Sequence, residues 1–285
     1  MRKIVLLVLC VVLLAGCKWA GKVSDAWQKK EQVVKIDRYD RVLDEYVSLN
    51  SYSAQQKMNL QYPRETKLLI EDVLAIGRVD EPDVEKRLRR LYLDSTMQVL
   101  LDEVHRQYVD MSDIEQQLGH AFLRLEEEDP DFRRPHVYTQ ISCMNQSIVV
   151  GDTLVGISLD KYLGADFPLY LDVFSASQRE TMTREHIVPD ALTFYLLYCY
   201  VEPRTGPPSA NDVSDMIAPI SRVHWAVAHI LGIQPLNHIV VPGHSSETLD
   251  LSEGLAEVDA YMKAHPNTSL IELLKDERQE MKNDK

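Results

Sequence analysis

The sequence predicts an α+β fold that is mainly α-helical and contains a small antiparallel sheet. Apolar residues recur every three or four positions from Tyr39 to Leu125, the spacing of helices with one buried face. Beyond Pro135 the spacing changes to short runs typical of strands, and helical spacing returns near Gln178. The chain has 285 residues, 45% of them hydrophobic, which suffices for a sizeable core. We therefore expect a single globular domain at 33–285, with a helical part at 33–130 and a small sheet plus helices at 135–285.

The N-terminus has the pattern of an export signal. Arg2 and Lys3 precede an apolar run that is shorter than the roughly 20 residues a membrane-spanning helix needs. The run closes on Leu13-Leu14-Ala15-Gly16-Cys17, which resembles the lipobox of bacterial lipoproteins. We expect a signal peptide at 1–16, lipidation of Cys17 by chains such as palmitate, and a lipidated tether at 17–32. An ordinary secretory signal with a chance cysteine is the alternative.

The residue after the cysteine bears on the destination. Lipoproteins that resemble this chain are sorted partly by that residue, and aspartate there tends to retain them at the inner membrane. Here Lys18 follows Cys17, and no acidic cluster resembling a surface-export signal comes next. We expect a lipid-anchored protein of the outer membrane that faces the periplasm.

Five helices are expected in the helical part. The first follows a β-like run at 33–36, with Asp37 as its candidate cap, and extends to Leu49. The next two cover about 68–76 and a segment opened by the acidic residues 80–83. The fourth has Asp94 or Ser95 as its cap, and the fifth begins with a capping box at Ser112 and Glu115. The acidic run at 126–129 is interpreted as a solvated connector, because it lacks the turn of a calcium loop.

Strands and further helices are expected beyond Pro135. The strands are predicted at 136–142, 147–150 and 153–159, and Gly151-Asp152 between the last two predicts a β-hairpin. Helices are predicted at 178–186, 188–201, 212–231, 252–263 and 269–280, with a proline-rich loop at 202–208.

Charge and cysteine content narrow the class of protein. The formal net charge is -13, which becomes -15 without Arg2 and Lys3, so no nucleic-acid partner is expected and a basic partner surface would suit the chain. Cys143 and Cys199 remain after the signal and the lipidated cysteine. The periplasm permits a disulfide between them, but their apolar surroundings favour two free thiols.

The central block is the most distinctive part of the sequence. It contains Tyr138-Thr139-Gln140-Ile141-Ser142, then 145–150 (NQSIVV), and then Gly156 to Tyr170, with the segment Leu159-Asp160-Lys161-Tyr162-Leu163-Gly164 inside it. Together with 187–190 and 36–40, this block resembles the gliding-motility lipoprotein GldB family of Bacteroidetes. The resemblance implies an accessory protein of the cell envelope that supports gliding and secretion machinery, and it implies no known reaction. It also suggests a distant, zincin-like relation to zinc-peptidase folds.

A polar cluster in this block is the candidate binding or structural site. Asp160, Asp166 and Asp190 with Tyr162 could form a cluster in which tyrosyl hydroxyls satisfy carboxylates. The alternative is that these residues fix a strand exit and cap helices. The aromatic residues around Phe194 and Tyr198 are interpreted as core rather than as a sugar-binding platform.

The spacing of the candidate residues argues against a zinc or serine hydrolase. His224 and His229 are five residues apart, which turns them by roughly 140° around a helix, and no glutamate stands between them. Glu253 is the nearest downstream candidate ligand. The segment 242–246 (PGHSS) does not form the elbow of a serine hydrolase.

These observations predict a membrane-anchored envelope lipoprotein, non-catalytic and without a cofactor or metal, that holds or positions other envelope or secretion-machinery proteins. Two alternatives stay open. One is a degenerate zincin-like metallohydrolase around His224, His229 and Glu253, and the other is a ligand-binding lipoprotein with a pocket near Asp160, Tyr162 and Asp190.

Overall fold

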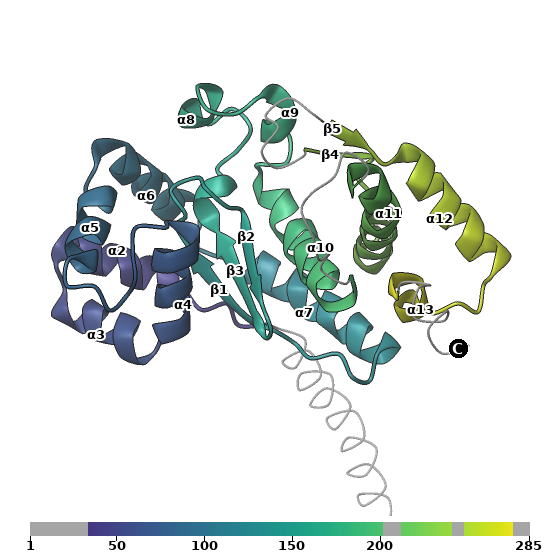
Figure 1. The fold of residues 1–285 in the computed structure, drawn as a ribbon, viewed down its shortest axis with the longest axis horizontal. Coiled ribbons are helices and arrows are strands. Elements are labelled where there is room, and N and C mark those ends of the chain that lie inside the picture. The colour runs from purple at the N-terminus through teal and green to yellow at the C-terminus, as the bar shows by residue number, and fades with distance from the viewer. Residues whose placement is uncertain (1–33, 202–211, 241–247, 276–285) are drawn as a thin grey trace, which may run out of the picture.

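A three-stranded sheet separates two groups of helices (Figure 1). The computed structural model describes residues 34–201, 212–240 and 248–275. The sheet consists of β1 (His136–Gln140), β2 (Ile148–Gly151) and β3 (Leu154–Ser158), in the order β1-β3-β2. Every residue of β3 is buried because helices cover both faces of the sheet. The predicted fold class, mainly helical with a small sheet, is confirmed.

The sheet is mixed rather than wholly antiparallel. The predicted hairpin is confirmed, since β2 and β3 pair antiparallel, but Gly151 lies opposite Leu154 and the turn is Asp152-Thr153 rather than Gly151-Asp152. β1 instead pairs parallel to β3, with Tyr138 opposite Gly156. A Cβ on Gly156 would lie only 2.5 Å from the Tyr138 ring, so the glycine allows this ring to cross β3.

The first group of helices covers one face of the sheet, and it is smaller than the predicted helical part because residues 112–128 lie on the other side. It contains α2 (Tyr39–Leu49), α3 (Tyr52–Leu60), α4 (Pro63–Lys67) continued by a π-helix (Leu68–Val73), α5 (Val84–Tyr92) and α6 (Ser95–Gln107). Large tyrosines fill its core, and the hydroxyls of Tyr39, Tyr92 and Tyr108 donate hydrogen bonds. Tyr92 donates to the Ile141 carbonyl over 2.5 Å, and Tyr108 donates to the Tyr162 carbonyl. These bonds fasten the helices to the segments that leave β1 and β3.

Three of the predicted local features between residues 34 and 115 are wrong. Residues 34–36 form no strand, and Asp37 does not cap a helix. The Asp37 amide donates to the Val137 carbonyl over 3.0 Å, which makes a single bridge beside β1. The capping box is absent because the Ser112 amide is taken by Asp110, while Glu115 Oε1 accepts from the Ile36 amide over 3.0 Å. Asp94 does cap α6, through the Thr96 amide.

The second group of helices lies on the other face. It contains α7 (Ser112–Glu128), α8 (Pro168–Leu171), α9 (Ala176–Arg179), α10 (Ile187–Tyr200), α11 (Asp212–Leu231), α12 (Ser252–Ala264) and α13 (Leu270–Leu274). α10 packs against β2 and β3, and α11 packs against α10 and α12. A two-stranded antiparallel ribbon of β4 (His238–Val240) and β5 (Thr248–Asp250) lies beside them. The helix predicted over 178–186 is wrong, because this segment holds only α9 and a 3-10 turn at Arg184–His186.

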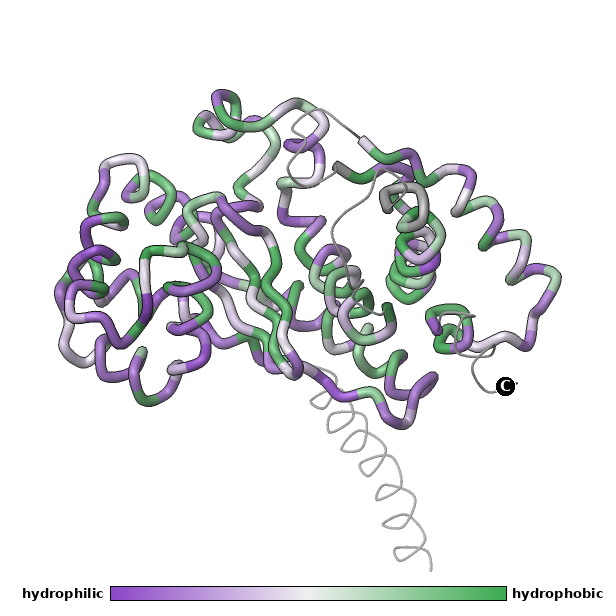
Figure 2. The backbone as a smooth tube through the Cα atoms, in the orientation of Figure 1, coloured by the Kyte–Doolittle hydropathy of each residue, from purple (hydrophilic) through white to green (hydrophobic). Residues whose placement is uncertain are grey.

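One hydrophobic core runs through both groups of helices, from Ile36 to Leu274. Figure 2 shows that β2, β3 and α10 are hydrophobic along most of their length. Such elements are buried on more than one side. α10 and the sheet therefore form the centre of the molecule.

The N-terminal predictions fall outside this description. The signal peptide, Cys17 and the tether at 17–32 lie outside the described residues, as does the proline-rich loop at 202–208. Within the described ranges, no helix has both the length and the apolar character needed to cross a membrane.

Candidate functional site

A cavity of about 780 Å³ lies where the sheet meets the second group of helices. One wall comes from the start of β2 and the turn before it, and a second from the 3-10 turn after β3 (Leu159–Lys161). α9, α10, α11 and the β4–β5 ribbon supply the rest. The cavity falls within the range of about 300–1,000 Å³ typical of sites for small molecules.

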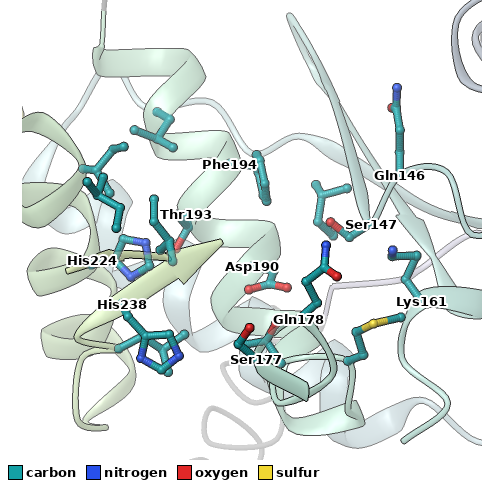
Figure 3. A pocket seen from close by; sticks show the side chains of 18 of the residues that line it. Gln146, Ser147, Lys161, Ser177, Gln178, Asp190, Thr193, Phe194, His224 and His238 are labelled. Atoms are coloured by element: carbon teal, nitrogen blue, oxygen red, sulfur yellow. The ribbon is translucent and has the colours of Figure 1, made fainter. Parts of the chain in front are cut away.

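Polar side chains lie on two opposite sides of this cavity, and among the described residues only one of these sides holds a lysine. Figure 3 shows Gln146, Ser147 and Lys161 on one side and His224 and His238 on the opposite side. Asp190 lies between the two. The apolar side chains come mainly from α10, α11 and the ribbon: Phe194, Leu197, Met216, Ile220, Ile239 and Leu249.

Asp190 brings a carboxyl group into the cavity from the first turn of α10. The Tyr162 hydroxyl donates a hydrogen bond to Asp190 Oδ2 over 2.8 Å. Burial raises the pKa of Asp190 from 3.8 to about 7, and the bond from Tyr162 opposes that rise. Asp190 therefore exchanges its proton near neutral pH.

Asp160 lies beneath the cavity wall and is fully buried. Its carboxylate accepts from the amides of Ser142 and Met144 over 2.8 and 2.6 Å. These amides belong to the turn at 142–145, where Cys143 and Met144 have φ of 55° and 64°. Positive φ is costly for such residues, so the carboxylate holds a strained turn in place. Asp160 thus supports the turn that follows β1.

Lys161 places a cation in the polar wall. Its Nζ donates to the Met144 carbonyl over 3.3 Å and lies 3.9 Å from the centre of the Phe174 ring. Burial lowers the pKa of this lysine, and the negative charge of Asp160 opposes that effect. The ammonium is thus fixed at the cavity surface by one backbone acceptor and one aromatic ring.

The structure brings together only part of the predicted cluster. Tyr162 and Asp190 are in contact, and Asp160 lies behind them, next to Lys161. Asp166 stays apart, because its side chain is fully exposed and its nearest ionic neighbour is Arg179 at 3.9 Å.

The histidine candidates do not converge. His224 lines the cavity, and burial lowers its pKa to about 4, so its ring is neutral at pH 7. His229 points elsewhere: it is exposed, stacks on Trp225, and lines a separate hollow of about 340 Å³. Glu253 is exposed on α12. Among the described residues, no three His, Cys, Asp or Glu side chains are grouped so that they could hold one metal ion.

Both remaining cysteines are free thiols, as their surroundings favoured. Burial, followed by the nearby charge of Asp160, raises the pKa of Cys143 to about 12. Burial also raises the pKa of Cys199. Neither thiol is readily ionised at neutral pH, so neither is a strong nucleophile.

Several cavity residues were not predicted from the sequence. Phe194 and Tyr198 were interpreted as core, but they are 43% and 50% exposed, and Phe194 lines the cavity. A signal for Phe194 was present. α10 buries one face against the sheet, while Asp190, Phe194 and Leu197 recur at helical spacing on a second face. Lys161, Phe174 and His238 carried no such signal.

A family model described as gliding motility protein GldB matches residues 17–219, which is most of the chain. The match confirms the resemblance carried by the central block. No curated protein and no solved structure gives a significant match.

Proposed function

Because this chain belongs to the family described as gliding motility protein GldB, we propose that it is a lipid-anchored, non-catalytic accessory protein of the cell envelope. In this proposal it holds or positions other proteins of the gliding or secretion machinery. The observation that carries it is the family match, which begins at residue 17, the same residue at which the lipobox pattern places the lipidated cysteine. The family description names a motility protein and no reaction.

The anchor follows from the chemistry of acylation. Burial of an acyl chain contributes about 0.8 kcal/mol per methylene, and two chains give stable attachment where one does not. With Lys18 after the lipidated cysteine, we place the protein in the outer membrane, facing the periplasm. Partners with basic surfaces suit its net charge of -13.

Metabolic labelling tests the anchor. Cells that express the tagged chain are grown with a clickable palmitate analogue and separated into soluble, inner-membrane and outer-membrane fractions. We expect label and outer-membrane recovery for the unaltered chain and for Cys10→Ser, which changes a cysteine inside the signal. Cys17→Ser should lose both. Equal labelling of Cys17→Ser would refute lipidation at this residue.

Pull-down tests the accessory role. The tagged, lipidated chain is solubilised in detergent, captured, and analysed by mass spectrometry at low and high salt, with zinc measured on the same eluate. We expect envelope or secretion-machinery proteins in stoichiometric amounts, with salt weakening those held by charge. Stoichiometric zinc that is lost on His224→Ala would overturn the non-catalytic proposal in favour of a hydrolase.

A further inference from the structure

Lys161 is a half-buried cation that faces the cavity. Among the described residues, it is the only lysine or arginine lining the cavity, and no carboxylate lies within the 4.0 Å salt-bridge distance of its Nζ. A lysine ammonium has three donors, of which the Met144 carbonyl occupies one. Asp160 lies behind Lys161, but its carboxylate is bonded to the amides of Ser142 and Met144. The two remaining donors of the ammonium are therefore available to an anionic group in the cavity.

The rest of the cavity is suited to an apolar body. Leu197, Ile220 and Leu249 line the side away from Lys161, and Phe194 and Met216 remain 43% and 45% exposed at its edge. Apolar surface that stays exposed inside a hollow gains free energy when a ligand covers it. The cavity therefore combines one fixed positive charge with an apolar chamber.

We propose that this cavity binds a long-chain carboxylate, whose head accepts hydrogen bonds from the Lys161 ammonium and whose chain lies against α10, α11 and the β4–β5 ribbon. One cation matches one negative charge. The Asp190 carboxyl in the same cavity disfavours heads that carry more than one. This binding activity is separate from the anchor and from the accessory role, and its test scores crosslinks in the cavity rather than membrane attachment or partner capture.

Photocrosslinking tests the proposal on the mature, lipidated chain in lipid nanodiscs. The probe is a sixteen-carbon carboxylate with a diazirine near its methyl end, and crosslinked peptides are mapped by mass spectrometry. We expect crosslinks in peptides that contain Leu197, Ile220 or Leu249. Unlabelled carboxylates of increasing length should compete with affinities that rise about fourfold per methylene until the chamber is filled.

The head group is tested by variants and matched ligands. Lys161→Gln should weaken the carboxylate by about tenfold or more and leave the corresponding sixteen-carbon alcohol unchanged, because only the charge-assisted bond is lost. Lys161→Arg should retain most of the affinity. Lys67→Gln, at a lysine whose side chain is 62% exposed, should change nothing. If Lys161→Gln does not fold, the proposal rests on two results. Lys161→Arg should retain most of the affinity for the carboxylate, and affinity for the unaltered protein should rise with the length of the carboxylate.

Several outcomes would overturn the proposal. Crosslinks outside the cavity would show that the hydrocarbon chain of the probe does not bind there. Competition that is independent of hydrocarbon length would show the same. If Lys161→Gln weakened binding of the carboxylate and of the alcohol equally, the charge of Lys161 would have no role in binding. A lysophospholipid or an apolar peptide that competes better than the carboxylate would identify a different class of ligand.

Discussion

Asp40 and Asp190 lie in the first turns of two helices that pack against the same sheet, but their surroundings differ. Asp40 is 1% exposed and binds Arg38 through both carboxylate oxygens, at 2.9 and 2.8 Å. Thr139 donates a further bond to it from β1. Within the described ranges, Asp190 accepts one hydrogen bond, from the Tyr162 hydroxyl, and it faces a cavity.

The difference shows how the two faces of the sheet are used. On the side of α2, the Asp40 carboxylate accepts hydrogen bonds from the Arg38 guanidinium and the Thr139 hydroxyl. On the side of α10, the polar groups are only partly engaged and border an apolar chamber. A carboxyl group with a shifted pKa beside a cavity is typical of binding sites. A carboxylate whose hydrogen bonds are all made within the protein is typical of structural support.

Removal of Asp40 is expected to have the largest effect. Asp40→Ala leaves the Arg38 guanidinium, whose side chain is 17% exposed, without its carboxylate, so unfolding free energy should fall by about 4 kcal/mol. Denaturant titration of the variant and the unaltered chain measures the loss. Asp80→Ala is the matched control, because Arg78 donates to both carboxylate oxygens of Asp80 in the same way but at the surface. No measurable change is expected there, and equal losses in both variants would contradict the burial argument.

Asp160→Ala should come next. The amides of Ser142 and Met144 lose their acceptor inside the protein, and the strained turn loses its anchor, so we expect a loss of about 3 kcal/mol. Thermal and denaturant unfolding test this. Asp172→Ala, at an exposed position after α8, is the control. A loss below about 0.5 kcal/mol at Asp160 would show that the turn holds without its carboxylate.

Asp190→Asn should change the pH dependence of stability. Burial raises the pKa of Asp190 from 3.8 to about 7, so between these values the folded protein holds a proton that the unfolded chain has released. Stability from this group is complete below pH 3.8 and is lost as the pH rises through about 7. The asparagine variant should thus be more stable than the unaltered chain at pH 8 and similar to it near pH 4. Unfolding curves across this range that stay parallel would contradict a raised pKa.

Asp166→Ala should have the smallest effect. This carboxylate is fully exposed and lies 3.9 Å from Arg179, so its removal should change neither stability nor carboxylate binding. Denaturant titration and the crosslinking competition check both. A clear loss of binding would place Asp166 in the site and enlarge the part of the predicted cluster that acts together.

The candidate site was only half predictable. The sequence grouped Tyr162 with Asp190, and the structure joins them at 2.8 Å, although 28 positions separate them. It included Asp166, which lies apart, and it missed Lys161 and Phe174, whose contact depends on how α8 and α9 fold over the turn after β3. Single residues of this kind carry no periodic signal, so contacts between them in the fold cannot be predicted from their spacing in the sequence.

By itself, the sequence determined the features that neighbouring residues control. Helical periodicity located α10 and α11, the latter at 212–231 and followed by Gly232 in the left-handed region, and a two-residue turn set the β2–β3 hairpin. The tertiary structure alone decided that β1 lies parallel to β3, that Asp40 is paired while Asp190 faces a cavity, and that Lys161 borders an apolar chamber. The physical reason is range: periodicity and turn chemistry act over a few residues, whereas pairing partners and cavities depend on where distant elements pack.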